Sequence, residues 1–319
     1  MNTKPIIIIS GEPLGVFNEI FLKILKKKSF RKPLVLIGSK KLLFQQAKKN
    51  RSKININLID FKNLDLKKIK NKKINLIDVH FEIKKSKNTN NNIKKYIQKC
   101  FDIGLYLIKE HDCSGLINGP INKKTFLNYR YPGVTEYLAN KFKSKIFAML
   151  IYTKNLAVCP ITTHMPLKNV HKSISKKEII KKVQLINSFY KRKFGKKAKI
   201  AITGLNPHCE SPVKVSEEKR IIIPAINSLK RNRIPIQGPF PADTIFLKNE
   251  IKKFDVIIGM YHDQVLGPIK ALYNFNAINI TLGLPFIRIS PDHGPNQKMF
   301  GKNLSNPQSL FQAIKFLDN

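Results

Sequence analysis

Short, wholly apolar runs alternate along this chain with segments whose apolar side chains recur at helical spacing. Residues 6–9 and 34–37 are runs of this kind, and each leads through glycine into a helical pattern. An apolar run without polar alternation is typical of a strand buried on both faces of a parallel sheet. The alternation predicts an α/β protein in which helices cover both faces of a mixed, mostly parallel sheet.

The residues at the start of the helical patterns support this assignment. Ser39 precedes the pattern at residues 40–49, and Ser175 with Glu178 forms a capping box ahead of another. A serine at this position accepts a hydrogen bond from an otherwise unpaired backbone N–H of the first turn. A further helix is expected over residues 93–111. These segments are therefore interpreted as helices that cover the sheet.

One pair of strands is expected to be antiparallel. Residues 148–151 and 156–161 are apolar and flank the short sequence Thr-Lys-Asn. So short a connection joins antiparallel strands, whereas parallel strands need a longer crossover. A chain of 319 residues is also too long for one comfortable core. We therefore expect two α/β lobes and a mixed sheet.

The formal charge of +39 raises the question of a nucleic-acid partner. Of the 59 basic residues, 51 are lysine, and they are spread along the chain. No stretch interleaves basic residues with aromatic ones, as single-strand binding surfaces do. The lysine content is interpreted as the codon habit of an AT-rich genome, and no nucleic-acid partner is expected.

Cysteine usage and the N-terminal residues bear on the compartment. The four cysteines, at positions 100, 113, 159 and 209, form no C-x-x-C pair. This pattern is typical of a reduced cytosol. Residues 1–9 contain only four consecutive apolar residues, too few for a signal sequence or a membrane span. The expected location is the cytoplasm, without a membrane partner.

Three of the seven histidines follow apolar, strand-like runs. They are His164, His208 and His262, and successive members are 44 and 54 positions apart in the sequence. Each interval can hold a helix and a return strand, so the three imidazoles would meet at the carboxyl edge of one sheet. Three imidazoles with open positions are typical of catalytic Zn²⁺ or a similar divalent ion. The alternative, that each histidine ends a strand and bonds nearby backbone, stays open.

Seven motifs stand in order along nearly the whole chain. They are Gly-Glu-Pro-Leu-Gly (11–15), Asn-Gly-Pro-Ile-Asn-Lys (118–123), Thr-Thr-His-Met-Pro-Leu (162–167), Gly-Leu-Asn-Pro-His (204–208), Pro-Ala-Asp-Thr (241–244), Tyr-His-Asp-Gln (261–264) and Asn-Ile-Thr-Leu-Gly-Leu-Pro-Phe-Ile-Arg (279–288). Together they resemble the 4-hydroxythreonine-4-phosphate dehydrogenase family of vitamin B6 synthesis. Motifs of this length are more specific than a lone glycine fingerprint.

A second likeness lies near the C-terminus. Residues 293–307 resemble the adenosine-binding loop of the isocitrate and isopropylmalate dehydrogenases. This likeness implies an isopropylmalate dehydrogenase-like fold and an NAD site without a Rossmann fingerprint. The residues expected to bind NAD are Asp292, His293, Gly294 and Asn306.

The family resemblance implies a reaction and a set of site residues. The reaction is NAD-dependent oxidation of 4-hydroxy-L-threonine 4-phosphate to 2-amino-3-oxo-4-phosphooxybutanoate, which decarboxylates to 3-amino-2-oxopropyl phosphate. A divalent ion (Zn, Mg or Co) would be held by His164, His208 and His262. The implied substrate-binding residues are Thr135, Lys270, Asn279 and Arg288. Asp243 and Asp263 would orient a histidine or relay the proton, although both could equally be solvated strand-end carboxylates.

The resemblance also implies an organisation of the chain. Residues 1–130 with 285–319 would form the NAD-side lobe, and residues 131–284 would form the metal, substrate and dimerisation lobe. The family completes each active site with residues of a partner subunit, so a homodimer is expected.

Three segments depart from the family pattern. The family's Gly-His-Thr-Glu is here Gly133-Val134-Thr135-Glu136. The family's glycine-rich loop after Asn-Pro-His is replaced by residues 209–216, and the opening loop ends in Val-Phe-Asn. Proline and β-branched residues cannot follow a glycine backbone path. Other functions therefore stay open: a dehydrogenase of another phosphorylated hydroxy acid, a three-histidine metal hydrolase, or a binding protein without catalysis.

Overall fold

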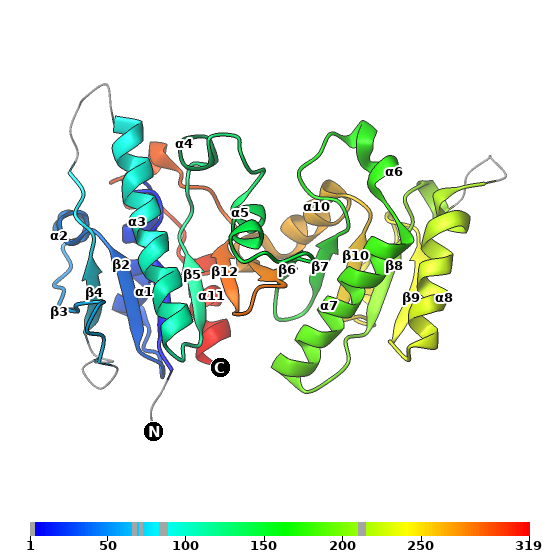
Figure 1. Cartoon of the computed structure of the whole chain (residues 1–319), viewed down its shortest axis with the longest axis horizontal. Coiled ribbons are helices and arrows are strands. Elements are labelled where there is room, and N and C mark those ends of the chain that lie inside the picture. Colours follow the sequence, from blue (N-terminus) through cyan, green and yellow to red (C-terminus); the bar gives the residue numbers. More distant parts are fainter. Residues whose placement is uncertain (1–3, 66–68, 70–72, 83–88, 210–214) are drawn as a thin grey trace. The chain divides into compact units, whose positions relative to one another are not determined.

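The chain folds as two compact α/β units in a computed structural model that describes residues 4–65, 69, 73–82, 89–209 and 215–319 (Figure 1). The first unit comprises Met1–Val134 and Phe286–Asn319, and the second comprises Thr135–Pro285. The roles that the sequence analysis gives to its two lobes stay predictions.

The first unit contains a parallel sheet. Its strands are β1 (Ile6–Ile9), β2 (Leu34–Gly38), β3 (Ile56–Leu58), β4 (Ile74–Asp78), β5 (Gly115–Asn118) and β12 (Arg288–Pro291). The order is β3-β4-β2-β1-β5-β12, and neighbouring strands are parallel. All four isoleucines of β1 are fully buried, as an apolar run in the middle of a covered sheet requires.

Helices cover this sheet. They are α1 (Phe17–Lys27), α2 (Lys40–Lys49), α3 (Thr89–Glu110), α4 (Lys123–Leu127) and α11 (Gln308–Asp318), with the 3₁₀ turn η6 (Gln297–Met299). Figure 1 shows α3 in front of β1 and β2, and α11 behind the sheet. A side chain at Gly104 of α3 would lie 2.8 Å from Ile9, so glycine permits the close packing of this helix.

The second unit contains a mixed sheet. Its strands are β6 (Ala148–Tyr152), β7 (Ala157–Pro160), β8 (Ile200–Thr203), β9 (Ile236–Phe240), β10 (Val256–Gly259) and β11 (Ile278–Leu282). In the order β11-β6-β7-β10-β8-β9, strand β6 is antiparallel to both of its neighbours and the other pairs are parallel. The predicted hairpin, and with it the mixed, mostly parallel sheet, is confirmed.

The helices of the second unit include long covering helices and short turns. They are α5 (Val134–Lys141), η2 (Leu167–Asn169), α6 (Val170–Ser173), α7 (Lys176–Phe194), η3 (Pro207–Cys209), the π-helical turn η4 (Glu218–Ile222), α8 (Ile223–Arg231), α9 (Lys248–Ile251), α10 (His262–Tyr273) and η5 (Asn274–Asn276). The N-cap of α7 is as predicted, since Ser175 Oγ accepts from the Glu178 N–H at 3.2 Å. Ser39 accepts from the Leu42 N–H at 3.4 Å and caps α2.

Helix α3 begins earlier than the apolar pattern predicts. The sequence places its start at Ile93, whereas the helix starts at Thr89. Residues 89–92 are Thr-Asn-Asn-Asn, which are more typical of turns, and the long apolar face that follows extends the helix over them. Across the described residues, no helix has the length and apolar character needed to span a membrane.

Candidate active site

Three neighbouring strands of the second unit deliver the three singled-out histidines. Strand β10 lies between β7 and β8 and is parallel to both. His164, His208 and His262 each follow the carboxyl end of one of these strands within five residues. Parallel strands present their carboxyl ends at one edge of a sheet, where open α/β sheets bind ligands. The sequence-based expectation of a shared edge therefore agrees with the strand order.

Two of the histidines lie side by side. The ring centroids of His164 and His262 are 5.7 Å apart, and both side chains are about a third exposed. Both line a cavity of about 500 Å³ together with Tyr261 and Leu167. The imidazoles therefore open onto a space large enough for a small substrate.

A carboxylate lies beside each imidazole of this pair. Glu136 Oε1 is 3.4 Å from His164 Nδ1, and Asp263 Oδ1 is 3.3 Å from His262 Nδ1. A carboxylate at Nδ1 favours the tautomer whose Nε2 lone pair is available to a metal. Imidazoles oriented in this way fit a divalent ion. The part played by Glu136 is not evident from the sequence, because Glu136 lies 28 positions before His164 and on a different element.

The assignment of His208 as a third metal ligand stays a prediction. Among the described residues, no group of three or more His, Cys, Asp or Glu side chains is arranged to hold a metal ion. The backbone of His208 is left-handed, with φ 55°, and that of Cys209 is too, with φ 62°. The strand spacing alone does not predict such a turn. The structure places His164 and His262 side by side, and the part of His208 in a metal site stays a prediction.

The turn before His208 is held by Glu218 of η4. Its Oε1 accepts from the backbone N–H groups of Leu205 and Asn206 at 2.8 and 2.9 Å. Burial alone would raise the pKa of Glu218, but hydrogen bonds from the Asn206 backbone and side chain, its own N–H and Ser216 hold that pKa below its ordinary value. Residues 210–214 of the altered loop lie outside the described residues.

Gln264 ties the ends of two of the histidine-bearing strands together. Its Oε1 accepts from the Met260 N–H at 2.6 Å and from Thr203 Oγ1 at 2.9 Å, and its Nε2 donates to the Gly204 carbonyl at 2.8 Å. These buried bonds join the carboxyl ends of β10 and β8. Gln264 therefore fixes the positions from which both chain segments leave the sheet.

The substrate-binding candidates of the second unit lie on different elements. Thr135 of α5 is buried, and its hydroxyl is 3.2 Å from that of Thr281 on β11. Asn279 lies two positions earlier on β11 and so faces the same side of the sheet. Its Oδ1 is buried without a hydrogen-bond partner among the described residues, which suits a ligand donor. Lys270 is an exposed residue of α10.

The two candidate catalytic aspartates are exposed. The Asp263 side chain is 88% exposed beside His262. Asp243 is exposed in the segment that follows β9. Neither carboxylate is desolvated in this chain, so their assignment as proton relays stays a prediction.

Arg288 lies in the first unit, at the start of β12. The side chain is 2% exposed, and its Nε donates to Asn118 Oδ1 at 2.7 Å. Asn118 ends β5, the strand paired with β12. Arg288 is therefore positioned at this sheet by a buried hydrogen bond.

The predicted NAD loop, residues 293–307, is bound to the first strand–turn–helix segment. The Val16 N–H donates to the Pro295 carbonyl at 3.1 Å, and Gln297 Nε2 donates to Glu12 Oε1 at 3.2 Å. Gly11 has φ 75°, and a side chain there would lie 2.5 Å from the Pro120 carbonyl oxygen. Only glycine allows this close approach between the turn after β1 and the segment that follows β5.

Glu12 connects three segments of the first unit. Its second carboxylate oxygen accepts from the Asn122 N–H at 3.0 Å. Burial raises the pKa of the Glu12 carboxyl, although the hydrogen bonds from Asn122 and Gln297 oppose that rise. The sequence motif contained Glu12, but only the structure shows that it joins the first turn to the NAD loop.

The C-terminal part of the loop is tied to α1 and α11. Lys23 Nζ donates to Glu19 and to the carbonyls of Asn303 and Ser305, each at 2.9 Å. Asn306 Oδ1 accepts from the N–H of Gln308, the first residue of α11, at 2.8 Å. Asp292 is held through its N–H by Ser309 Oγ at 2.9 Å, and His293 Nδ1 lies 2.9 Å from the Gly294 carbonyl. The residues predicted to bind NAD therefore lie on a segment that hydrogen bonds hold in place.

Comparison with known proteins agrees with these features. Residues 29–317 match the family described as pyridoxal phosphate biosynthetic protein PdxA. A 4-hydroxythreonine-4-phosphate dehydrogenase of a Sulfurihydrogenibium species is 42% identical over 97% of this chain and 95% of its own length. A D-threonate 4-phosphate dehydrogenase of Salmonella typhimurium is 30% identical over 99% and 98%.

A solved structure shares the fold. The 4-hydroxythreonine-4-phosphate dehydrogenase of Klebsiella pneumoniae superposes with a TM-score of 0.83 at 28% identity, covering 99% of this chain and 98% of that one. The match spans both units of the chain rather than one of them. The family match, the sequence identities and the shared fold lead to one conclusion: this chain belongs to the PdxA family of pyridoxal phosphate biosynthetic proteins, and it is a dehydrogenase of that family.

Proposed function

We propose that this chain oxidises 4-hydroxy-L-threonine 4-phosphate with NAD in vitamin B6 synthesis. The observation that carries the proposal is the His164–His262 pair, oriented by Glu136 and Asp263 at the carboxyl edge of a parallel sheet. Relatives at 33–42% identity are named for this substrate.

The proposed reaction balances as a hydride transfer followed by loss of CO₂. The C3–H bond breaks and hydride goes to the nicotinamide, while the C3 hydroxyl proton goes to a base, for which Asp243 and Asp263 are the candidates. The resulting 3-oxo acid loses its carboxyl group as CO₂, and a proton replaces it. The product is 3-amino-2-oxopropyl phosphate.

We propose a divalent ion at His164 and His262, with His208 as third ligand. When bound, such an ion supplies a Lewis acid for the alcohol oxygen. The chain's own contribution is to place a carboxylate at Nδ1 of each imidazole, which favours the tautomer whose Nε2 is free to bind a metal, and to place both imidazoles at the cavity. Zn, Mg and Co are the candidates. Imidazole ligands suit the borderline ions Zn²⁺ and Co²⁺, whereas Mg²⁺ is a hard ion that prefers oxygen ligands.

Phosphate and carboxylate recognition is assigned to Lys270, Arg288, Asn279 and Thr135. Two cations and two neutral hydrogen-bonding groups suit an anionic, hydroxylated substrate. Support comes from the buried, unsatisfied Oδ1 of Asn279 and from the contact that fixes the Thr135 hydroxyl beside Thr281.

NAD is proposed as the cofactor, with NADP disfavoured. Asp292, His293, Gly294 and Asn306 are assigned to it on the loop tied down by Glu12 and Lys23. Residues 293–307 contain no arginine to bind a 2′-phosphate in a bidentate manner, although Lys298 and Lys302 are present. Comparable kcat/KM values with the two cofactors would refute this assignment.

A second substrate is favoured by one observation. Val134 replaces the family's histidine at the start of α5 and is 8% exposed. A relative at 30% identity is named for D-threonate 4-phosphate. A dehydrogenase for another phosphorylated hydroxy acid on this scaffold is therefore the alternative, whereas a metal hydrolase finds no support in the family match.

A homodimer is part of the proposal. Near the histidine pair, Leu167 is 68% exposed, and elsewhere in the second unit Leu247 and Phe275 are 58% and 51% exposed. Single exposed apolar side chains are normal on protein surfaces, so the proposal rests on the family resemblance, in which a partner subunit completes each active site. Sedimentation at micromolar concentration tests the dimer, and an active monomer would refute it.

The decisive experiment is a substrate panel. Purified protein with each divalent metal is given NAD and either 4-hydroxy-L-threonine 4-phosphate, D-threonate 4-phosphate or their unphosphorylated forms, and NADH is followed by its near-ultraviolet absorbance. The proposal expects the highest kcat/KM with the first substrate. A higher value with D-threonate 4-phosphate selects the alternative, and absence of NADH formation with every substrate refutes both.

A further inference from the structure

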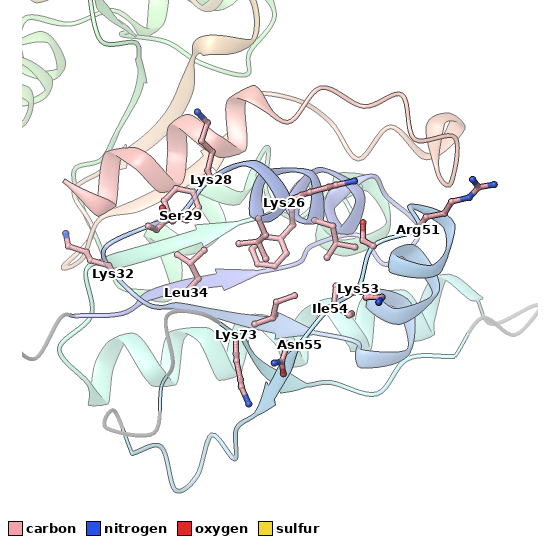
Figure 2. Close-up of a pocket in the computed structure, with 16 residues that line it drawn as sticks. Lys26, Lys28, Ser29, Lys32, Leu34, Arg51, Lys53, Ile54, Asn55 and Lys73 are labelled. Carbon is pink, nitrogen blue, oxygen red and sulfur yellow. The ribbon is translucent and has the colours of Figure 1, made fainter.

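A second cavity lies at the amino ends of the strands in the first unit's sheet, and Figure 2 shows the residues that line it. Its volume is about 540 Å³. It is lined by α1, by the segments that lead into β2 and β3, and by the start of β4. These are the amino ends of the strands, whereas the turn after β1 and the loop after β12 lie at their carboxyl ends. The cavity is thus separate from the dehydrogenase residues.

The inside of this cavity is apolar. Leu25, Phe30, Leu34 and Ile54 line it and are only half-buried, so their apolar surface stays open to solvent. Figure 2 shows Leu34 and Ile54 toward the middle of the lining residues. Open apolar surface inside a cavity of this volume is typical of small-molecule sites, which span about 300–1,000 Å³.

The rim of the cavity is cationic. It carries Lys26, Lys28, Lys32, Arg51, Lys53 and Lys73, and none of the sixteen described residues that line it is acidic. Lys32 is engaged by the Leu317 carbonyl, and Lys28 lies 5.6 Å from the Phe311 ring centroid. Within the described part of the chain, Lys26, Arg51 and Lys53 make no ion pair.

Lysine is abundant everywhere in this chain, so a cationic rim alone is not distinctive. The combination is distinctive, because the same cavity holds open apolar surface and a cationic rim. Among the rim residues, Lys32 lies near the Asp318 carboxylate, whereas Lys26, Arg51 and Lys53 make no ion pair with any described residue. Figure 2 shows Lys26, Arg51 and Lys53 toward one side and Lys32 toward the other, with Leu34 between them. A ligand with an apolar body inside the cavity and an anionic group at its rim would suit both features.

We propose that this cavity binds a small amphipathic anion, which has an apolar body and one carboxylate or phosphate head group. The body would displace water from Leu25, Phe30, Leu34 and Ile54, and the head group would lie near Lys26 and Lys53. Aromatic phosphates and medium-chain acyl carboxylates share this chemistry. Binding here is independent of the dehydrogenase reaction and of the metal.

The test measures binding of 1-naphthyl phosphate and of decanoate to the full chain by calorimetry, with saturating NAD present. Each is compared with its uncharged counterpart, 1-naphthol or decanol, and inorganic phosphate is measured alone. Saturable binding of one anion per chain, tighter than both the uncharged counterpart and phosphate, is expected. The anion that binds more tightly shows whether the cavity prefers an aromatic or an acyl body.

Two variants locate the site. The double substitution Lys26→Gln with Lys53→Gln should weaken binding about threefold to tenfold, as the loss of two exposed charge contacts predicts. Ile54→Gln should weaken it through the lost apolar contact. The matched control is Lys27→Gln with Lys48→Gln, which removes the same number of positive charges. Both lysines are exposed residues of α1 and α2 that do not line the cavity.

Several results would overturn the proposal. They are absence of saturable binding for both anions, equal affinity for the uncharged counterparts, displacement of the bound anion on NAD titration, or equal effects of the rim variant and its control. Circular dichroism spectra and unfolding midpoints matching the parent protein establish that each variant is folded. If Ile54→Gln fails to fold, the rim variant and its control still decide the question.

Discussion

The imidazole rings of His164 and His262 lie 5.7 Å apart between centroids, although they follow different strands of the second unit. The parallel pairing of β7 with β10 brings them together, from Val256 opposite Ala157 to Gly259 opposite Pro160. Each ring has a carboxylate at Nδ1, from Glu136 on α5 for one and from Asp263 on α10 for the other. The predictions below begin from this pair.

Glu136→Gln should lower the affinity for a divalent metal by about 10- to 100-fold, because the carboxylate that orients His164 is lost. Calorimetric titration of chelator-stripped protein with Zn²⁺ and Co²⁺ measures the change. Glu250→Gln is the matched control, since Glu250 pairs only with exposed Lys253 among the contacts described. Equal metal affinity of the two variants would contradict the orienting role of Glu136.

His208→Ala tests the proposed third ligand. If His208 joins the pair when metal binds, its removal should weaken metal binding as strongly as His164→Ala does. The same titration provides the measurement, with His171→Ala as a control on exposed α6. Metal affinity unchanged by His208→Ala would leave a site of two imidazoles and refute the three-histidine assignment.

Val134→His should restore a donor for phosphate at the start of α5. One charge-assisted hydrogen bond contributes roughly 1.5–3 kcal/mol, or about tenfold to 150-fold in affinity. The KM for 4-hydroxy-L-threonine 4-phosphate should therefore fall, with little change in kcat, because phosphate contacts are largely uniform binding. An unchanged or higher KM would count against the phosphate assignment at this position.

Glu12→Gln should change the pH dependence of stability. Burial raises the pKa of Glu12 in the folded chain, so folding favours the protonated form. The parent protein should then lose stability relative to Glu12→Gln as the pH rises from 4.5 through the folded-state pKa. Urea unfolding of both proteins across this pH range measures the difference in their stability. A difference that stays constant with pH would refute the predicted shift.

Glu218→Gln should show the opposite pH dependence. Hydrogen bonds from Asn206 and Ser216 outweigh burial and lower the Glu218 pKa. The contribution of Glu218 to stability is present above pH 4.5, and it is lost as the pH falls through the lower pKa that Glu218 has in the folded state. The advantage of the parent protein over Glu218→Gln in urea unfolding should therefore shrink on acidification. An advantage that grows at low pH would contradict this.

Much of the fold follows from local sequence. The buried strand β1, the capped helices α2 and α7, and the β6–β7 hairpin were all predicted, because each depends on neighbours within a few residues. Apolar runs, capping serines and a short connection act over one or two turns of chain. The early start of α3 was missed because the packing of its long apolar face outweighs the turn preference of three successive asparagines.

The sequence by itself also determined that three histidines follow strands, and that the motifs match one family. Only the tertiary structure decided which groups meet. It placed Glu136 against His164, Glu12 against Gln297, and Gln264 between β8 and β10. It also gave His208 a left-handed backbone, which the strand spacing alone does not predict. Spacing along the chain determines the edge at which a residue emerges, but the backbone dihedral angles of the connecting turns and the packing of distant helices determine where its side chain lies.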